Sequence, residues 1–437
     1  MSDLDAALEV FRRLHPRKID LGLGRVERVL EALGNPQHRL PPAVHIAGTN
    51  GKGSTVALLR AMLEASGARV HTYTSPHLVR FNERIVVASQ EIGDDALIDV
   101  LQRTAAANDG QPLSFFEATT AAAFLAFSET PADYAVIEVG LGGRYDATNV
   151  FTPRACAITP VDLDHAEFLG RDLAKVAGEK ACIIKPGVPV FCGPQQEAAR
   201  AVIEAEAQKH GATLQAFGEH YRSYRQQGRL VFETERELLD LPLPALHGEH
   251  QVGNAGTAIA VARELGLGAD AIGEGLQSAS WPARMQPLTR GPLVEIASEA
   301  GAEVWLDGGH NPHAARALAA HLGLLEARSP RPLILLIGIL ANKDAGGFLD
   351  YFEGLASGLV AVSIDGHASQ SPEVLAELAG SRGMVGIVGN NLTDAMQKAV
   401  NMGEALSRQT VEEPIVPPRI LVCGSLYMAG EVLAQNG

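Results

Sequence analysis

Hydrophobic residues along this chain alternate between short continuous apolar runs and longer runs with a period near 3.6 residues. The apolar runs predict buried strands, and the periodic runs predict helices that cover them. In the first half, strands are predicted over 43–48, 68–74, 133–140, 154–159 and 188–192, and helices over 56–63, 95–107, 116–127 and 197–210. This alternation is typical of a parallel sheet with helices on its faces.

The alternation is interrupted by residues 221–234, which predict a small antiparallel hairpin. It restarts after residues 281–292, a segment rich in proline and glycine. New strands are predicted over 303–308, 332–340, 358–366, 384–389 and 419–427, and helices over 312–325 and 392–400. Residues 408–419 are expected to form an exposed loop before the last strand.

A chain of 437 residues is too long for one typical hydrophobic core, so two domains are expected. The punctuation by Pro287, Gly291 and Pro292 places the boundary near residues 285–292. We therefore predict an α/β protein with an N-terminal parallel-sheet domain over residues 1–285 and a second α/β domain over residues 292–437.

The segment AGTNGKGSTVALL, residues 47–59, leads from a predicted strand into a predicted helix. Its glycines, Gly48, Gly51 and Gly53, allow backbone conformations in which successive N–H groups point at one anion. A phosphate bound there would lie at the positive end of the helix. The segment therefore predicts a phosphate-binding loop.

Three side chains could complete this loop. Lys52 can reach the outer phosphates, and Ser54 or Thr55 can offer a hydroxyl to the Mg²⁺ that accompanies a nucleotide. The spacing differs from the Walker A pattern, because Gly53 separates the lysine from the hydroxyl residues. The alternative interpretation is a glycine-rich turn with a solvated lysine.

Acidic side chains follow two further predicted strands. Glu138 ends one strand before a glycine-rich turn, and Asp162, Asp164 and His165 follow the next. Because ligands of parallel sheets gather at the carboxyl ends of strands, these groups should share one crevice with the phosphate loop. A carboxylate there could hold Mg²⁺. The alternatives are an acid satisfied by backbone N–H groups and a structural histidine.

Lys180 stands in an otherwise apolar helical segment, beside Glu179. Read alone, its apolar stem would snorkel along the surface or its amine would pair with an acid.

In the second half, Gln251 and Asn254 begin a helix, Arg284 lies in WPARM, and Asp307 and His310 follow a strand. Each has an ordinary surface interpretation. Together they suggest a second face that closes on a nucleotide.

Composition narrows the function classes. The formal net charge of −15 argues against a nonspecific nucleic-acid binder, because such proteins need a positive field. The acidic, amphipathic N-terminus predicts neither a signal peptide nor a membrane span. No C-x-x-C spacing occurs, so buried thiols in a reducing compartment, and hence a cytoplasmic protein, are expected for Cys156, Cys182, Cys192 and Cys423.

Taken in order over nearly the whole chain, ten segments resemble the folylpolyglutamate synthase/dihydrofolate synthase family of bacteria, in the superfamily of the muramyl ligases. They are HIAGTNGKGS, TSPHLVRFNERI, FFEATT, EVGLGGRYDATN, LDHAEFLG, GEKACIIKPGVPV, HQVGNA, WPARM, LDGGHNPHA and GILANKD. The resemblance implies a P-loop ATPase domain followed by a Rossmann-like ligase domain, as in Mur ligases, with glutamate and nucleotide contacts at their interface. The chain departs from common family residues at Cys182, Ala283, Met285, Gln286 and Gly309.

The resemblance also assigns roles to residues. Lys52, Lys180 and His310 would be catalytic. The nucleotide would contact Gly48, Thr49, Asn50, Gly51, Lys52, Gly53, Ser54, Thr55, Asn254, Arg284, Asp307 and His310. Two Mg²⁺ sites would use Ser54, Ser75, Glu138, His165 and Lys180, the lysine as a carbamate. The pterin substrate would contact Phe115, Phe116, Arg144 and Asp146.

The implied reaction is ADP-forming ligation of L-glutamate to 7,8-dihydropteroate and to reduced folates, with ATP and Mg²⁺ and through an acyl phosphate. We expect a monomer without nucleic-acid or membrane partners. Three alternatives remain at this point: an enzyme restricted to polyglutamate extension, a muramyl-type ligase, and a slow P-loop switch.

Overall fold

The chain divides into two compact units, which are described separately. The structure is a computed structural model and describes residues 3–14, 22–164, 170, 172–410 and 416–436. The first unit comprises Met1–Ala245 and Gln251–Ser280, and the second comprises Leu246–His250 and Trp281–Gly437.

The first unit is built on an eight-stranded sheet with the order β4-β3-β2-β5-β1-β6-β7-β8. Strands β2, β5, β1, β6, β7 and β8 are parallel, whereas β3 and β4 pair antiparallel at one edge. The strands are β1 (Ala43–Ala47), β2 (Val70–Tyr73), β3 (Ile85–Val87), β4 (Gln90–Glu91), β5 (Tyr134–Glu138), β6 (Ala155–Ile158), β7 (Val190–Cys192) and β8 (Leu214–Ala216). The central strand β1 is buried along its whole length, so its carboxyl end can hold the following loop in a fixed position.

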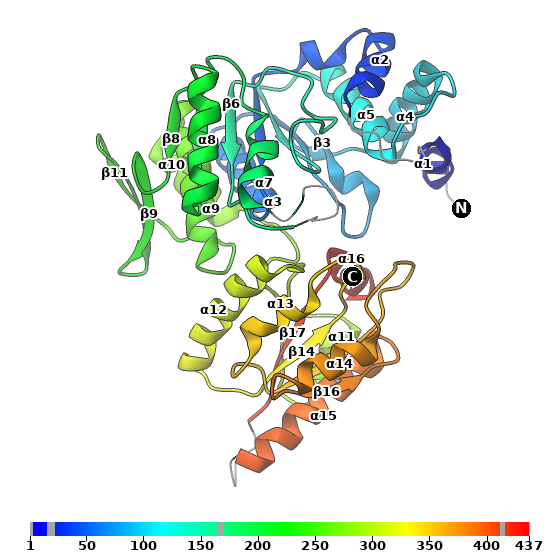
Figure 1. Ribbon diagram of the computed structural model, residues 1–437, viewed down its shortest axis with the longest axis vertical. Helices are drawn as coiled ribbons and strands as arrows, with labels where there is room; N and C mark the ends of the chain where they lie inside the picture. The colour runs from blue at the N-terminus through cyan, green and yellow to red at the C-terminus, as the bar shows by residue number, and fades with distance from the viewer. Residues whose placement is uncertain (1–2, 15–21, 165–169, 171, 411–415, 437) are drawn as a thin grey trace. The chain divides into compact units, whose positions relative to one another are not determined.

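Several of the helices pack on this sheet through two hydrophobic cores. One hydrophobic core joins α1, α2, α4 and α5, which Figure 1 shows clustered together, and another joins α7 and α8. The unit contains α1 (Asp3–Leu14), α2 (Gly24–Ala32), η1 (Pro36–Arg39), α3 (Lys52–Ala65), η2 (Phe81–Arg84), α4 (Asp94–Asn108), α5 (Phe115–Glu129), α7 (Leu173–Ala181), α8 (Glu197–Lys209), α9 (His250–Glu264) and α10 (Ala269–Ser278). Helix α9 begins at His250, which clusters with the second unit, and continues in the first.

The predicted hairpin is confirmed, with one strand more than expected. Strands β9 (Tyr221–Gln226), β10 (Arg229–Thr234) and β11 (Leu238–Leu241) form a separate antiparallel sheet.

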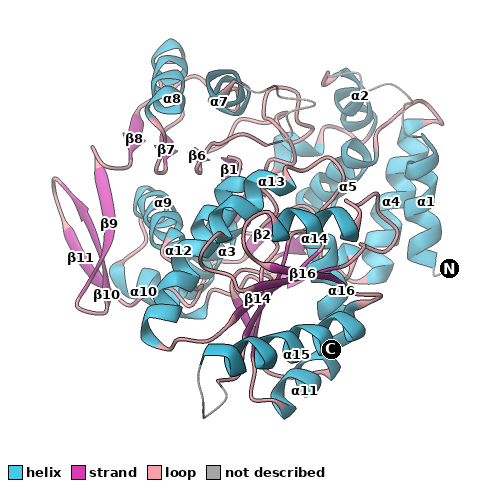
Figure 2. Cartoon of the chain, turned by 60° about the horizontal axis from the view of Figure 1, so that its bottom comes forward, coloured by secondary structure: helices cyan, strands magenta, loops and turns pink. Residues whose placement is uncertain are grey.

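The second unit is built on a six-stranded sheet with the order β12-β13-β17-β14-β15-β16. Its strands are β12 (Gln286–Leu288), β13 (Glu303–Leu306), β14 (Leu333–Ile337), β15 (Gly358–Ala361), β16 (Val385–Val388) and β17 (Arg419–Cys423), and only β12 among them pairs antiparallel. Its helices are α11 (Pro292–Glu299), α12 (Pro312–Arg328), α13 (Ala345–Leu349), η3 (Asp350–Phe352), α14 (Pro372–Gly380), α15 (Leu392–Thr410) and α16 (Leu426–Asn436). Figure 2 shows α12, α13 and α14 on one side of the sheet and α11 and α15 on the other.

The predicted fold class is confirmed: both units are α/β, and every parallel strand except β8 lies within a predicted apolar run. The cysteines are free thiols, and all except the half-buried Cys182 are buried. Among the described residues, no helix combines the length and the hydrophobicity that crossing a bilayer requires.

The predicted exposed loop over residues 408–419 is wrong at both ends. Helix α15 continues to Thr410, and Arg419 is the first residue of β17, with a side chain only 2% exposed. Arg419 Nε donates to Glu303 Oε2 at 2.9 Å, and its Nη1 donates to Glu326. A buried guanidinium is tolerated because two carboxylates from distant segments neutralise it.

We expect Arg419→Ala to destabilise the second unit by about 3–5 kcal/mol, because the change leaves the largely buried Glu326 without its guanidinium partner, whereas the more exposed Glu303 keeps Arg331 at 3.2 Å. Arg229→Ala is the matched control: Arg229 pairs with Asp240 at 2.7 Å, but both side chains are about half exposed, so a loss of about 0–1 kcal/mol is expected. Urea unfolding of both variants measures the difference. Equal midpoints would contradict a stabilising role for the Arg419 network.

Candidate active site

The phosphate loop connects β1 to α3, as predicted. Gly48 has φ +153°, and a Cβ there would lie 1.9 Å from Thr159 Oγ1. Gly51 has φ +84°, and a Cβ there would lie 2.4 Å from Asn254 Oδ1. Both positions therefore require glycine for their backbone conformation, and at Gly48 the neighbouring Thr159 also leaves no space for a Cβ.

The loop is fastened to the segment that follows β6. The N–H groups of Thr49 and Asn50 both donate to Pro160 O, at 2.9 and 3.3 Å, and Thr49 Oγ1 donates to Asp162 O at 2.8 Å. These two loop amides are therefore already engaged. The donors left for an anion are the N–H groups of the first turn of α3, which have no partner within the helix.

Lys52 and Glu138 lie together beside this loop. Lys52 Nζ donates to Gly48 O at 3.2 Å and lies 3.8 Å from Glu138 Oε1. Glu138 ends β5 and is 5% exposed, and its Oε2 accepts the Ser75 N–H at 3.3 Å. Three predicted site residues thus meet at the carboxyl ends of β1, β2 and β5.

Gln251 and Asn254 lie on α9 and contact the phosphate loop and the first turn of α3, which corrects their expected place on a second face. Gln251 Nε2 donates to Ser54 Oγ at 3.2 Å, and Gln251 Oε1 accepts from Asn254 Nδ2 at 2.9 Å. Both residues belong to the first unit. Thr55 is fully buried, and its Oγ1 has no hydrogen-bond partner among the described residues.

Lys180 is neither snorkelled nor paired with the adjacent acid. Its side chain is buried, and its Nζ donates to Gly48 O at 2.9 Å. Burial, and then the charge of Lys52, lowers its pKa to about 7, while Asp164 and Asp146 act in the opposite direction. The neighbouring Glu179 pairs instead with Arg144, at 2.9 Å.

The glycine-rich loop over residues 140–149 is held by Asp146. Its Oδ2 accepts from Leu141 N at 2.8 Å, and its Oδ1 accepts from the N–H and the hydroxyl of Thr148. Burial raises the pKa of Asp146, and these hydrogen bonds counteract that rise. In this structure, the carboxylate orders its own loop; a direct contact between Asp146 and a pterin stays a prediction.

The aromatic residues predicted to contact substrate lie at the start of α5. Phe116 packs against this loop, because a Cβ on Gly140 would lie 2.4 Å from its ring, and its centroid lies 5.9 Å from that of Tyr73. Phe115 lies edge-on to Phe81, with a centroid distance of 5.8 Å. Their packing leaves a substrate role as a prediction.

In the second unit, Asp307 fixes the backbone around Arg284. The Asp307 carboxylate accepts from Met285 N at 2.7 Å and from Gly309 N at 2.6 Å. Ala283 and Met285, on either side of Arg284, have φ +55° and +42°. Such strained conformations persist where the surroundings over-determine them and are common at functional sites.

His310 and Gly309, which follow Asp307 closely in sequence, fit the backbone conformation that Asp307 fixes. His310 Nδ1 lies 2.9 Å from Gly308 O, so that nitrogen carries the proton. A Cβ at Gly309 would lie 2.9 Å from Asp307 Oδ1. The glycine that departs from the family alanine therefore fits this turn.

The residues around the phosphate loop suit a hard cation. Ser54, Ser75 and Glu138 offer hydroxyl and carboxylate oxygens, the ligand type that Mg²⁺ prefers. The described residues contain no group of three or more His, Cys, Asp and Glu side chains able to hold a metal. His165, predicted as a ligand, lies outside the described residues.

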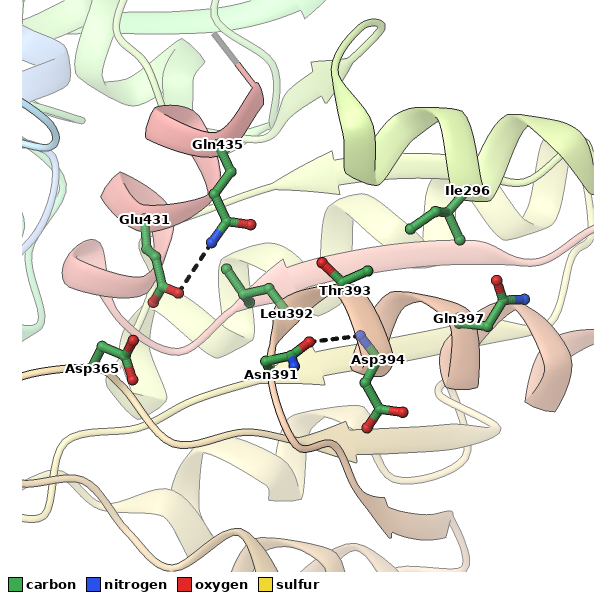
Figure 3. A pocket seen from close by; sticks show the side chains of 9 residues that line it. All are labelled: Ile296, Asp365, Asn391, Leu392, Thr393, Asp394, Gln397, Glu431 and Gln435. Carbon is green, nitrogen blue, oxygen red and sulfur yellow. Dashed lines mark hydrogen bonds between the residues drawn. The ribbon is translucent and has the colours of Figure 1, made fainter.

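A separate pocket of about 690 Å³ lies in the second unit, near the start of α15 and along α16 (Figure 3). It is lined by Ile296, Asp365, Asn391, Leu392, Thr393, Asp394, Gln397, Glu431 and Gln435. Burial, and then the charge of Asp365, raises the pKa of Glu431. Its three carboxylates, Asp365, Asp394 and Glu431, would make the pocket repel an anionic ligand, so a phosphate-binding site is not expected in this pocket.

Sequence reasoning missed three residues that support the site. Thr159 clamps the phosphate loop through Asn50 O at 2.8 Å, and His45 contacts Thr148 Oγ1 at 2.9 Å. Each pair is more than 100 positions apart in sequence. The only local signal was a polar residue inside, or next to, an apolar strand.

Comparison with known proteins gives the family context. Residues 46–262 match the Mur ligase middle domain, and residues 293–412 match the Mur ligase glutamate ligase domain. The chain is 32% identical to a dihydrofolate synthase/folylpolyglutamate synthase of Escherichia coli, covering 99% of this chain and 95% of the relative. It is 34% identical to a folylpolyglutamate synthase of Lacticaseibacillus casei, covering 93% and 92%.

A solved structure agrees with these matches. The bifunctional folylpolyglutamate synthase/dihydrofolate synthase of Yersinia pestis, complexed with AMPPNP and Mn ion, superposes with a TM-score of 0.84 at 31% identity. The match covers 99% of this chain and 98% of that one.

Proposed function

Because the chain belongs to the dihydrofolate synthase/folylpolyglutamate synthase family of Mur ligases, we propose that it is a bifunctional, ADP-forming ligase. It joins L-glutamate to 7,8-dihydropteroate and to reduced folates, using ATP and Mg²⁺. The observation that carries the proposal is the convergence of Lys52, Glu138 and Lys180 on the loop that begins at Gly48. A nucleotide switch needs a phosphate loop, but it does not need a buried lysine from another helix, such as Lys180, that contacts this loop.

The reaction has two steps. A substrate carboxylate oxygen attacks the γ-phosphorus of ATP, the bond to the ADP oxygen breaks, and an acyl phosphate forms. The neutral amine of glutamate then attacks the acyl carbon, the bond between that carbon and the bridging oxygen breaks, phosphate leaves with this oxygen, and the nitrogen releases one proton to solvent. Both steps bring anions together, so preorganised positive groups lower the barrier most.

Residues of the first unit suit these tasks. Lys52 can neutralise charge on the transferred phosphoryl group, and the N–H groups at the start of α3 can bind phosphate oxygens. Ser54, Ser75 and Glu138, with a carbamylated Lys180, would hold Mg²⁺. When bound, the cation would withdraw charge from the phosphate oxygens. Gln251 and Asn254 support the loop from α9.

The restricted alternative is folylpolyglutamate synthase activity only, the name given to the L. casei relative. The bifunctional reading is favoured by the GGRYDATN and FFEATT segments, which resemble the bacterial form that takes dihydropteroate. We further propose that the protein acts as a monomer in the cytoplasm.

Release of ADP tests the function directly. Purified protein with Mg·ATP should release ADP with dihydropteroate plus glutamate and with tetrahydrofolate plus glutamate, and should release little when glutamate is omitted. A UDP-muramyl substrate should give no turnover. ADP release with tetrahydrofolate alone among the acceptors would leave the restricted alternative, and release with none of them would contradict the ligase.

Arg284 gives a prediction for the second unit. We propose that it contacts the nucleotide, so Arg284→Ala should raise the KM for ATP by roughly ten- to hundredfold through loss of a charge-assisted contact. The exposed Arg290, on the same segment, supplies the control Arg290→Ala, which should keep the wild-type KM. Steady-state kinetics at saturating glutamate measures both. An unchanged KM in Arg284→Ala would contradict the assignment.

A further inference from the structure

A chain of buried polar side chains connects β1 to the glycine-rich loop of residues 140–149. His45 Nε2 lies 2.9 Å from Thr148 Oγ1, and the Thr148 hydroxyl donates to Asp146 Oδ1. His45 and Thr148 are fully buried, and Asp146 is 5% exposed. The described mechanism uses neither His45 nor Thr148.

The hydrogen bonds fix the direction of this chain. Because Thr148 Oγ1 gives its only proton to Asp146, it must accept from His45, so His45 Nε2 carries the ring proton. His45 is neutral, since burial and the charge of Lys185 lower its pKa to about 3. Its Nδ1 is then a bare acceptor, buried and without a hydrogen-bond partner among the described residues.

An unsatisfied buried ring nitrogen destabilises the fold, and an apolar side chain on β1 would avoid this cost. A polar network kept at such a cost points to a requirement other than stability. That requirement is found at Asp146, the last member of the hydrogen-bonded series. Its carboxylate accepts from the N–H groups of Leu141 and Thr148 and so closes the loop.

The loop is also registered against α7. Arg144 N donates to Glu179 O at 3.0 Å, and a Cβ at Gly143 would lie 2.5 Å from that oxygen and 3.0 Å from Lys180 Cα. The loop is therefore held by the His45 network at one contact and by the backbone of Glu179 and Lys180 at another. A displacement of Thr148 and Asp146 would change the backbone conformation of the loop between these contacts.

We infer that His45 and Thr148 are positioning residues that act through Asp146 to hold loop 140–149 in the geometry that binds the pterin substrate. They touch neither the phosphate loop nor Lys52 in the described contacts, so they should affect pterin affinity and leave ATP affinity unchanged. This inference rests on the proposed function, because the pterin is the ligand assigned to that loop.

The test compares His45→Leu and Thr148→Val with conservative variants that keep the donors, His45→Gln and Thr148→Ser. The first pair should raise the KM for dihydropteroate by about five- to 150-fold, the range for loss of one buried hydrogen bond, with the KM for ATP unchanged. The second pair should keep a KM for dihydropteroate close to that of the wild type. The matched control is Thr104→Val, since Thr104 is fully buried and donates to Val100 O at 2.7 Å, away from the loop.

Hydrogen exchange gives a readout that does not depend on activity. The amides of Leu141 and Thr148 should exchange on the order of tenfold faster in His45→Leu and Thr148→Val, and at wild-type rates in Thr104→Val. Unchanged exchange, or equal changes in both KM values, would overturn the inference. If the variants exchange faster but the wild-type protein does not turn over dihydropteroate, the role of His45 and Thr148 in holding the loop is retained and the proposed substrate is rejected.

Discussion

Lys52→Ala should lower kcat/KM for ligation by about a thousandfold or more, because it removes the cation that we propose faces the transferred phosphoryl group. Lys52 Nζ lies within 3.3 Å of Gly48 O and Thr49 O and 3.8 Å from Glu138 Oε1, so the contacts that hold its amine are polar. Its loss should therefore shift the melting temperature by only a few degrees, consistent with a change of about 1 kcal/mol.

Lys398→Ala is the matched control for this change. Lys398 is also half-buried, donates to a carbonyl, Val388 O at 3.0 Å, and lies 2.8 Å from a carboxylate, that of Asp394. It should keep wild-type turnover. Ligation near the wild-type rate in Lys52→Ala, with a normal melting curve, would remove the phosphate loop from the mechanism.

Lys180 should carry a carbamate, and Lys180→Met should lose turnover by at least about a hundredfold while the protein stays folded. The amine adds to CO₂ and releases one proton, which requires the neutral form. With a pKa of about 7, close to half of the Lys180 amines are neutral at pH 7, whereas an ordinary lysine is almost fully protonated there. Carbamate formation should therefore accelerate as the pH rises through about 7.

Spectroscopy separates this account from a purely structural role. Protein equilibrated with ¹³CO₂ should show one slowly exchanging carbamate signal, absent in Lys180→Met and present in Lys175→Met, a control at an exposed lysine of the same helix. Short carboxylates should partly restore activity to Lys180→Ala. Full activity in Lys180→Ala, or an enzyme with no carbamate signal and full turnover, would contradict the modification.

The parallel sheets could be predicted from the sequence because their strands are continuous apolar runs, as in Ile334–Ile337 and Val136–Ile137. The short antiparallel strands β3, β4 and β12 could not, because they hold only two or three residues each, and β4 and β12 are partly or fully exposed. Such short segments carry little periodic signal, and their pairing is decided by the neighbouring strand.

The phosphate loop and Glu138 could likewise be predicted, since strand ends and glycines are local signals. The contact of Gln251 with Ser54 joins residues 197 positions apart, and the burial of Arg419 depends on Glu303 and Glu326 in other segments. A single sequence shows residue types along the chain but not which distant partner satisfies a buried polar group. For that reason, Asn254 was expected on the wrong face and Arg419 in an exposed loop.

Transfer of oxygen from substrate to phosphate tests the central claim most directly. Dihydropteroate labelled with ¹⁸O in both carboxylate oxygens is incubated with the protein, Mg·ATP and L-glutamate, and the released phosphate and the pterin product are analysed by mass spectrometry. Ligation through an acyl phosphate predicts one ¹⁸O in the phosphate and one in the amide of the product, in equal amounts. Stoichiometric release of ADP with unlabelled phosphate would contradict it, because the oxygen would then have come from water.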